Sequence, residues 1–166
     1  MKHVIYSFIC VVIATLICAC GAQRSQASYD YPSKVLSANN DGTYVIRVQV
    51  RARNAAIAFT DAQRKAVKEV LFKGVQAGSN GISDLKPICF DMNAEAKYED
   101  YFNAFFADNG EWKQFVSLKD KRTATTTYQR NGKQMIETVT VSVDRANLKK
   151  KMQADGIVPA QNMYEL

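Results

Sequence analysis

The stretch TYVIRVQVRAR, residues 43–53, decides the fold that we predict from this sequence. Apolar and polar residues alternate along it with a period of two, which indicates a β-strand with one buried and one solvated face. The residues of the buried face are Tyr44, Ile46, Val48, Val50 and Ala52. The residues of the solvated face are Val45, Arg47, Gln49, Arg51 and Arg53. The strand therefore belongs to a sheet that packs on one side only.

An amphipathic helix is predicted directly after this strand. Small or apolar residues recur every four positions and form a ridge that lets a helix approach a sheet closely. They are Ala58, Ala62, Ala66 and Val70. Asn54 is suited to cap the helix, although the capping-box pattern of residues 60–63 offers a later start. Gly74 or Gly78 would end it.

Residues 78–97 are typical of a loop, with glycine, serine and asparagine at its start. Within it, Leu85–Phe90 is predicted to form a short edge strand, because Pro87 removes one hydrogen-bond donor from the ladder. Cys89 has apolar neighbours, and in such a setting a free cysteine usually packs as a small buried hydrophobe. A reactive thiol is the alternative.

The clearest helical pattern in the chain is aromatic. Its residues recur at positions i, i+3, i+4, i+7 and i+8, and they are Tyr98, Tyr101, Phe102, Phe105 and Phe106. Residues 108–110 break the pattern, and Trp112 and Phe115 extend it into a further helical turn. At this spacing we expect the rings to pack in a core. The alternative is a groove whose rim would use rings with polar ends, namely Tyr98, Tyr101 and Trp112.

Residues 121–143 are predicted to form a β-hairpin around Asn131-Gly132, a dipeptide typical of a type I′ turn. The expected pairs are Tyr128 with Met135, Thr127 with Ile136, Thr126 with Glu137, Thr125 with Thr138, Ala124 with Val139, and Thr123 with Thr140. Glu137 then falls on the apolar face. We expect it to lie near an edge and reach water, and a binding carboxylate is the alternative.

A last helix is predicted after Asp144, which is suited to cap it. Leu148 and Met152 would be its buried residues, and Gly156 would end it. Residues 158–166 are expected to form a loose C-terminal tail.

Together these elements predict one α+β domain over residues 41–157. Their order is strand, helix, short strand, aromatic helix, β-hairpin and helix. Three or four strands are too few to close a barrel. We therefore expect a single small antiparallel or mixed sheet with the helices packed on one face. The arginine-bearing side of the strand at residues 43–53 would be the open side.

The N-terminal segment has the composition of a signal peptide. Lys2 and His3 precede an almost unbroken apolar run over residues 4–17. The run is shorter than the ~20 apolar residues of a transmembrane helix, and it fits the hydrophobic region of a secretory signal. An uncleaved signal anchor or an ordinary, non-lipidated signal peptide is the alternative.

The end of this run, LICAC at residues 16–20, resembles the lipobox of bacterial lipoproteins. The resemblance implies cleavage of residues 1–19, a diacylglycerol thioether on Cys20 and an acyl chain such as palmitate on its amine. Residues 20–40 are rich in small and polar types and would form a flexible tether. No acidic residue directly follows Cys20, which in this family implies the periplasmic side of the outer membrane.

Cleavage would leave few side chains for catalysis. His3 is the only histidine, and it would leave with the signal. This excludes Ser-His-Asp and Cys-His catalysis and histidine-based zinc sites, and lipidation of Cys20 leaves Cys89 without a disulfide partner. We expect no cofactor or metal apart from the covalent lipid. A carboxylate-based enzyme is the residual alternative, with the acids Glu95, Glu99, Asp100 and Glu137.

The candidate binding residues are basic and come from the strand and the last helix. They are Arg47, Arg51, Arg53, Lys149, Lys150 and Lys151. Such groups would grip an anionic partner, and a solvated surface is the alternative interpretation. The helix that runs into residues 71–74 and the aromatic helix after it are similar to small envelope lipoproteins, a resemblance that implies no particular activity.

The resulting hypothesis is a non-enzymatic accessory subunit of an outer-membrane or periplasmic assembly. It would be held on the membrane by the lipid and would have an envelope protein as its partner, with no role for nucleic acid. The alternative is a module that binds peptidoglycan or another anionic glycan.

Overall fold

The computed structural model describes residues 32–78, 81–128 and 135–159, with the side chains of residues 120–135 left out of the description. These residues belong to one compact unit. The predicted signal segment, Cys20, the Asn131-Gly132 turn and residues 160–166 lie outside the described part of the chain.

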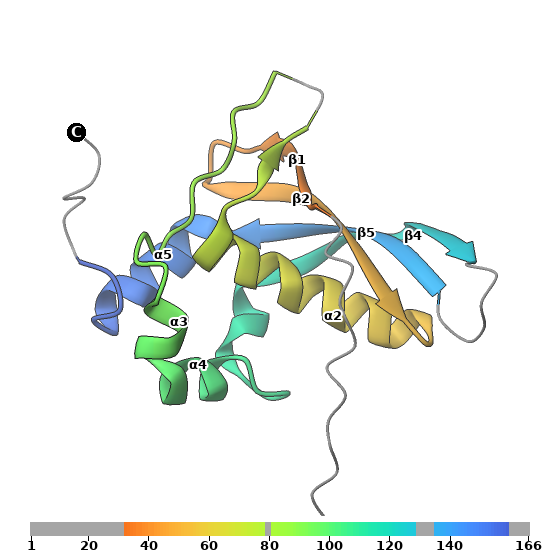
Figure 1. Ribbon diagram of the computed structural model, residues 1–166. Coiled ribbons are helices and arrows are strands. Elements are labelled where there is room, and N and C mark those ends of the chain that lie inside the picture. The colour runs from red at the N-terminus through yellow and green to blue at the C-terminus, as the bar shows by residue number, and fades with distance from the viewer. Residues whose placement is uncertain (1–31, 79–80, 129–134, 160–166) are drawn as a thin grey trace, which may run out of the picture. The chain divides into compact units, whose positions relative to one another are not determined.

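Five strands form one mixed sheet in the order β3-β1-β2-β5-β4 (Figure 1). Their bounds are β1 Lys34–Ala38, β2 Thr43–Ala52, β3 Gln76–Ala77, β4 Val116–Tyr128 and β5 Met135–Asp144. The short strand β3 runs parallel to β1, and the other neighbours are antiparallel. The long middle pair, β2 and β5, is the centre of the sheet.

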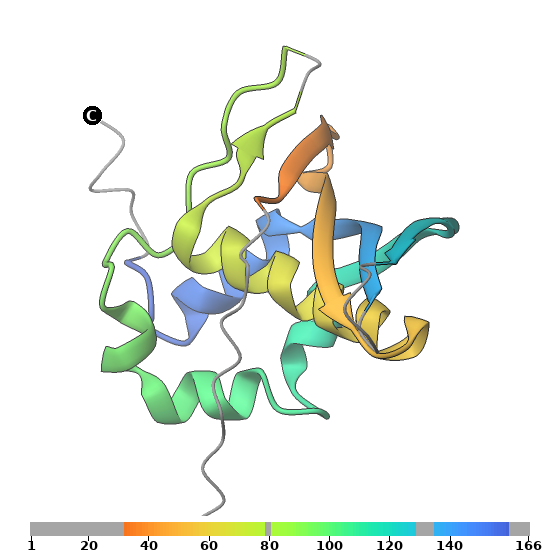
Figure 2. The ribbon, with the colours of Figure 1, turned by 45° about the vertical axis from the view of Figure 1, so that its right-hand side comes forward.

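The helices lie on one side of this sheet (Figures 1 and 2). The α-helices are α2 Ala55–Lys68, α3 Ala94–Lys97, α4 Glu99–Phe105 and α5 Arg145–Ala154. A π-helical turn, η2 Glu69–Lys73, continues α2, and a 3-10 turn, η3 Glu111–Phe115, leads into β4. The predicted α+β class with a single mixed sheet and helices on one face is confirmed.

Strand β2 follows the predicted alternation with one exception. Ile46 and Val48 are fully buried in the core shared with the helices, and Arg47 is exposed on the other face. Val45 was predicted to be solvated, and this is wrong because only 6% of it is exposed. Val45 lies between two neighbouring strands, and its short side chain does not reach past them as an arginine does.

Helix α2 begins at Ala55, so the later start at residues 60–63 is wrong. The Asn54 side chain accepts a hydrogen bond from the backbone of Ile57 at 2.9 Å and caps the helix. The ridge residues Ala58, Ala62 and Ala66 are fully buried. Small side chains are needed here because α2 lies directly against β2 and β5.

Gly74 ends this helical segment, so the first of the two predicted ends is confirmed and Gly78 is wrong. Its backbone has φ 78° and ψ 173°, a region that residues with a side chain rarely adopt. A Cβ at this position would lie 2.5 Å from the carbonyl oxygen of Leu85. Glycine is therefore required both for the backbone conformation and for the close approach of the following loop.

Strand β1 corrects the predicted tether. Residues 20–40 were expected to be flexible, but Lys34–Ala38 pairs with β2, and Val35 is fully buried. The turn to β2 is closed by Asp41, whose carboxylate accepts from the backbone and hydroxyl of Thr43. The sequence did not predict this strand because its apolar residues Val35 and Leu36 are adjacent and do not alternate with polar ones.

The predicted edge strand Leu85–Phe90 is wrong. Leu85 forms only an isolated antiparallel bridge to Val75. Ile88 and Cys89 instead donate backbone hydrogen bonds to the carbonyls of Val70 and Leu71, at 3.0 and 2.8 Å. These carbonyls lie at the end of a helix and need external donors, so the loop satisfies the helix terminus rather than extending the sheet.

The aromatic segment forms two short helices, α3 and α4, which meet at Tyr98. Phe102 and Phe105 are almost completely buried, and the Phe72 ring packs edge-on against Phe102 with centroids 4.8 Å apart. The prediction that this stripe packs in the core is confirmed for its phenylalanines.

The hairpin register is confirmed close to the turn. Thr125 pairs with Thr138 and Tyr128 pairs with Met135, as do the two pairs between them. Farther away, the prediction that Thr123 faces Thr140 is wrong, because Thr140 pairs with Asp120. A register shift between residues 120 and 125 changes the alignment, and β4 begins earlier than predicted, at Val116.

Glu137 corrects a second hairpin prediction. It was expected near an edge and in contact with water, but β5 lies between β2 and β4, and only 2% of Glu137 is exposed. One of its carboxylate oxygens has no hydrogen-bond partner among the described residues.

Helix α5 matches the prediction. The Asp144 side chain caps it by accepting from the backbone of Asn147 at 3.0 Å. Leu148 and Met152 are fully buried, and each such side chain contributes about 1.5–3 kcal/mol through burial. The expected loose tail is wrong at its first residue, because the Val158 backbone donates to the Met152 carbonyl and its side chain packs on the core.

Candidate functional site

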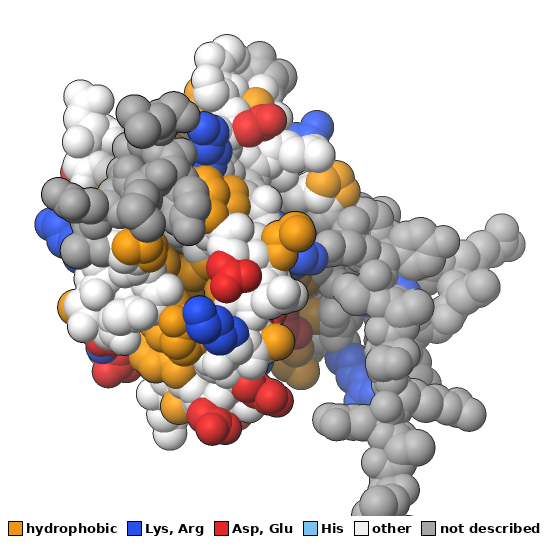
Figure 3. Space-filling view, turned by 60° about the vertical axis from the view of Figure 1, so that its left-hand side comes forward, with side chains coloured by type: hydrophobic (Ala, Val, Ile, Leu, Met, Phe, Trp, Pro, Cys, Tyr) orange, Lys and Arg blue, Asp and Glu red, His pale blue; other side chains and the backbone are white. Residues whose placement is uncertain are grey.

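A pocket of about 550 Å³ lies at the end of the molecule where the loop 86–91, helix α3 and helix α5 meet. The turn 156–159 closes its remaining side. Figure 3 looks toward this end of the molecule, where hydrophobic, basic and acidic side chains lie next to one another. The volume is in the range of sites that hold small ligands. The sequence did not predict it, because three segments that are far apart in the chain build it.

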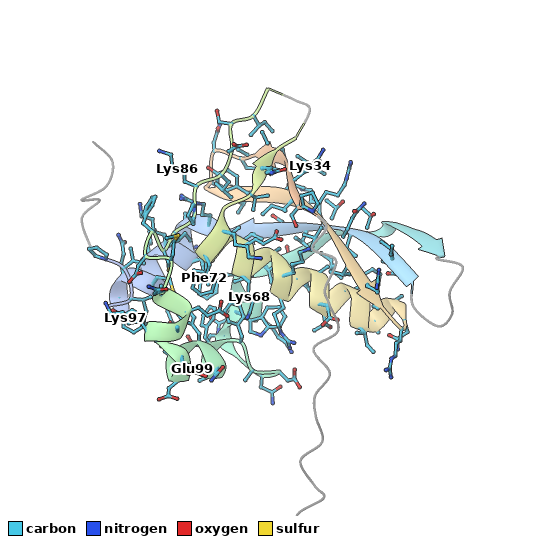
Figure 4. The ribbon with its side chains drawn as sticks, viewed as in Figure 1. Lys34, Lys68, Phe72, Lys86, Lys97 and Glu99 are labelled. Carbon is cyan, nitrogen blue, oxygen red and sulfur yellow. The ribbon has the colours of Figure 1, made fainter. Side chains whose placement is uncertain are left out.

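Basic side chains dominate the charge around this pocket. Lys86 and Lys97 line it from the loop and α3, and Arg145 and Lys149 line it from α5. Asp91 is the only acid among the lining residues that the structure describes. Figure 4 shows Lys86 and Lys97 at the same end of the molecule, whereas Lys34 lies beside the sheet. A pocket with this balance attracts anions.

Arg145 ties the two walls together. Its guanidinium donates a hydrogen bond of 3.2 Å to the backbone carbonyl of Lys86. Its Nε atom is buried and has no hydrogen-bond partner among the described residues. Since Lys149 follows Arg145 by four positions on α5, both side chains lie on the same side of the helix.

Cys89 contributes a buried thiol to the pocket lining. Burial, followed by the charge of the nearby Asp91 carboxylate, raises the pKa of this thiol from its ordinary 9.0 to about 11. The thiol is therefore protonated at neutral pH and is a poor nucleophile. The predicted buried cysteine is confirmed, and its chemistry is that of an apolar surface.

The open face of the sheet is a second basic surface. Arg47 and Arg51 are exposed on it, Arg53 is exposed in the bend directly after β2, and Lys34 of β1 lies directly beside Arg47 in the register. The core residues Ile46, Val48 and Val50 point to the opposite face, where α2 packs. No described helix covers the arginines. This surface was predicted from the alternation in β2.

The structure does not bring the predicted lysines to this surface. Leu148 and Met152 of α5 share the core with Ile46 and Val48, so α5 and its lysines lie on the other side of the sheet. The predicted binding face is therefore two separate surfaces.

The three lysines also differ from one another. Lys149 lines the pocket, and Lys150 is exposed outside it. Lys151 forms ion pairs with Glu111 at 2.9 Å and Asp155 at 3.1 Å. Hydrogen bonds to Glu111 and then to Asp155 raise the pKa of Lys151. Lys151 therefore links α5 to η3 and is not a free binding group.

The predicted aromatic rim is only partly present. Tyr98 lines the pocket and is half-buried. Tyr101 donates a hydrogen bond from its hydroxyl to Asp155, and burial, followed by this bond, raises the pKa of the phenol. Trp112 as a rim residue is wrong, because only 1% of it is exposed and its indole Nε1 donates to the Ala107 carbonyl at 2.9 Å.

A second hollow, of about 710 Å³, lies between α2 and the helices α3 and α4. Two of the acids proposed for an enzyme, Glu95 and Glu99, line it. Lys68 pairs with Glu95 at 2.8 Å, and about half of the Glu95 side chain is exposed. The Glu95 carboxylate is thus paired with a lysine and partly in contact with water. The other two proposed acids, Asp100 and Glu137, do not line it.

Among the described residues, no group of three or more His, Cys, Asp or Glu side chains is placed to hold a metal ion. None of the described helices combines the length and the apolar character that a membrane crossing requires.

Comparison with known proteins adds no relative. No protein-family model, curated protein or solved structure matches this chain. Function must therefore be argued from the chain's own surfaces.

Proposed function

We propose that this chain is a lipid-anchored, non-enzymatic protein of the cell envelope that docks an acidic partner as an accessory subunit of an outer-membrane or periplasmic assembly. The observation that carries the docking part is the open sheet face, where Arg47, Arg51 and Arg53 are exposed and no described helix covers them. The lipobox-like residues 16–20 support the anchor.

The open face has the shape and chemistry of a protein-docking surface. Between its basic side chains lie half-buried polar groups, and Gln49 donates a hydrogen bond of 3.3 Å to Thr138 across the two central strands. A flat surface of this kind offers charge complementarity over a wide area. Such complementarity mainly sets the rate of association and the choice of partner.

The start of the folded domain limits how far it would stand from the membrane. Because β1 begins at Lys34, a lipid on Cys20 would be joined to the domain by roughly 13 residues, which reach at most about 45 Å when fully extended. The partner surface would then have to lie close to the same membrane.

The test is purification of the tagged full chain from gently solubilised envelopes, followed by identification of the proteins that come with it. We expect one or two near-stoichiometric partners, and we expect the double substitution Arg47→Glu/Arg53→Glu to remove them. Lys150→Glu is the matched control, since it reverses an exposed charge on the other side of the sheet. Cys20→Ser should release the chain from the membrane.

Two results would contradict the proposal. Equal loss of partners in the sheet-face variant and in Lys150→Glu would mean that net charge, not this face, is recognised. Isolation of the chain alone or with glycan fragments only would favour the peptidoglycan or anionic-glycan module. In that case, co-sedimentation of the wild type with purified sacculi should weaken as salt is added.

A further inference from the structure

We propose that the pocket between the loop 86–91, α3 and α5 binds a small anionic amphiphile: a phosphate or carboxylate head group carried on an apolar body. The proposal is independent of the sheet-face function, because it uses a different surface and a different class of ligand. It rests on the lining of the pocket, on the charge at its rim and on the way its walls are held.

The lining provides an apolar floor. Ile88, Cys89 and Ala94 are each less than 5% exposed and lie at the base of the loop and α3. Above them, Phe90 leaves 44% of its surface in contact with solvent, and the Tyr98 ring is half-buried. Covering the exposed parts of the Phe90 and Tyr98 rings stabilises a complex by about 25 cal/mol for each Å² removed from water. The floor therefore favours an apolar body.

Two rim lysines, Lys86 and Lys97, provide positive charge at the pocket. In the described part of the chain, no ion pair involves Lys86 or Lys97. The ammonium group of Lys97 lies 5.2 Å from the centre of the Tyr98 ring, which leaves its charge available at the edge of the apolar floor. The buried, unpartnered Nε of Arg145 is one donor that an anionic head group would satisfy.

The walls are held in place without a ligand. The loop is fixed by the backbone bond from Cys89 to Leu71, and the turn after α5 is fixed by the bond from Ile157 to Met152, at 2.8 and 2.9 Å. The bond from Arg145 to the Lys86 carbonyl joins the loop to α5. A preformed pocket loses little conformational freedom on binding, which raises affinity for a small ligand.

Shape and polarity together select an amphiphile over the other anions that the charge alone would attract. An inorganic anion would leave the exposed parts of the Phe90 and Tyr98 rings in water, and a highly hydroxylated glycan would place polar groups against Phe90 without hydrogen-bond partners. An acidic protein surface would fit poorly, because the site is concave. A head group on the lysines with its apolar body on the floor satisfies both parts of the pocket.

The test uses residues 21–166, which contain the whole compact unit Tyr31–Leu166 and have Cys89 as their single cysteine. Binding of octyl phosphate, octanoate, octanol and inorganic phosphate is measured by calorimetry below the micelle concentration of each amphiphile. We expect one site, with octyl phosphate or octanoate bound at least about tenfold more tightly than octanol and inorganic phosphate. The stronger of the two anionic amphiphiles identifies the head group.

The matched variants are Lys149→Gln and Lys150→Gln, neighbours on α5 of which only Lys149 lines the pocket. Lys149→Gln should weaken binding about tenfold, the loss expected for one charge-assisted contact. Lys150→Gln should leave binding within about twofold, as is usual for exposed charges. Bound ligand should also slow alkylation of Cys89, which places the ligand in this pocket. Circular dichroism confirms that both variants are folded.

Several outcomes would overturn the proposal. They are equal weakening by the two variants, octanol or inorganic phosphate binding as tightly as octyl phosphate, alkylation of Cys89 unaffected by saturating ligand, and the absence of saturable binding by both anionic amphiphiles. None of these results would bear on docking at the sheet face.

Discussion

The two basic surfaces of this molecule carry similar charges on very different supports. On the open sheet face, Arg47 and Arg51 of β2 are exposed, whereas the apolar residues of that face, Val45 and Ile136, are buried between the strands. In the pocket, Lys86, Lys97, Arg145 and Lys149 lie beside apolar side chains that include the partly exposed ring of Phe90. The exposed groups of the first region are thus charged and polar, and those of the second combine charge with apolar surface. The difference teaches that charge alone does not define a ligand class.

The largest expected effect is the loss of unfolding free energy when a buried side chain of α5, which forms one wall of the pocket, is shortened. Leu148 is fully buried beneath the α5 wall of the pocket. Leu148→Ala should lower the free energy of unfolding by about 2–5 kcal/mol, since it removes buried methyl groups and leaves a cavity. Urea denaturation followed by circular dichroism measures it. A loss below about 1 kcal/mol would mean that α5 is not fastened to the core as described.

The next largest changes in unfolding free energy are expected at two glycines that differ in the space around them. Gly74→Ala should cost about 2–3 kcal/mol of unfolding free energy, because the backbone region is essentially restricted to glycine and the Cβ would meet the Leu85 carbonyl. Gly156 at the end of α5 also has a positive φ, 72°, but no atom lies within 4 Å of its added Cβ. Gly156→Ala should cost only about 1 kcal/mol. Equal costs in thermal or urea unfolding would contradict the clash at Gly74.

The thiol of Cys89 tests whether the pocket floor is desolvated. With a pKa of about 11, about 1% of it is ionised at pH 9, against about half of a thiol at the ordinary value of 9.0. Iodoacetamide should therefore react at least about 30-fold more slowly with the folded chain than with the urea-unfolded chain. The double variant Arg47→Cys/Cys89→Ala provides the comparison, because its single thiol lies on the sheet face. This thiol should react with iodoacetamide as fast in the folded chain as in the unfolded chain.

The same pKa predicts a dependence of stability on pH. Because the folded-state pKa of Cys89 lies above the ordinary one, its contribution to stability is complete below pH 9 and is lost as pH rises toward 11. Cys89→Ala should make the fall of the unfolding free energy in this window less steep. Part of the fall of the unfolding free energy should remain in this variant, because the pKa of Tyr101 is also raised. An unchanged slope would show that the thiol is not desolvated.

The smallest expected effect lies on the sheet face itself. Arg47 is exposed, so Arg47→Ala should change the unfolding free energy by less than about 0.5 kcal/mol. Differential scanning calorimetry would detect a larger change. A cost above about 1 kcal/mol would mean that Arg47 stabilises the sheet, and its value as a docking residue would then be difficult to separate from folding.

Local signals in the sequence predicted much of this fold. The alternation in residues 43–53 identified β2, and the side chains of Asn54 and Asp144 cap the two longest helices as expected. The register next to the hairpin turn was also correct. Each of these features depends on residues only a few positions apart, and their preferences are expressed in any surroundings that allow them.

Features that depend on distant neighbours were missed or misjudged. Strand β1 is short and has little pattern of its own, and its pairing with β2 and β3 stabilises it. Glu137 was expected near an edge, and Trp112 was offered as a rim residue because its ring has a polar end, whereas the structure buries both.

The sequence by itself determined the α+β class, the start of the last helix at Asp144 and the basic side of β2, and it limited the start and the end of the helix after β2 to two candidates each. Local hydrogen bonding and the period of the apolar residues are sufficient for these. Only the tertiary structure decided that Arg47 and Lys149 lie on different surfaces and that the loop 86–91, α3 and α5 enclose a pocket. Those outcomes depend on which faces pack together, and burial of a shared core, not local preference, selects that arrangement.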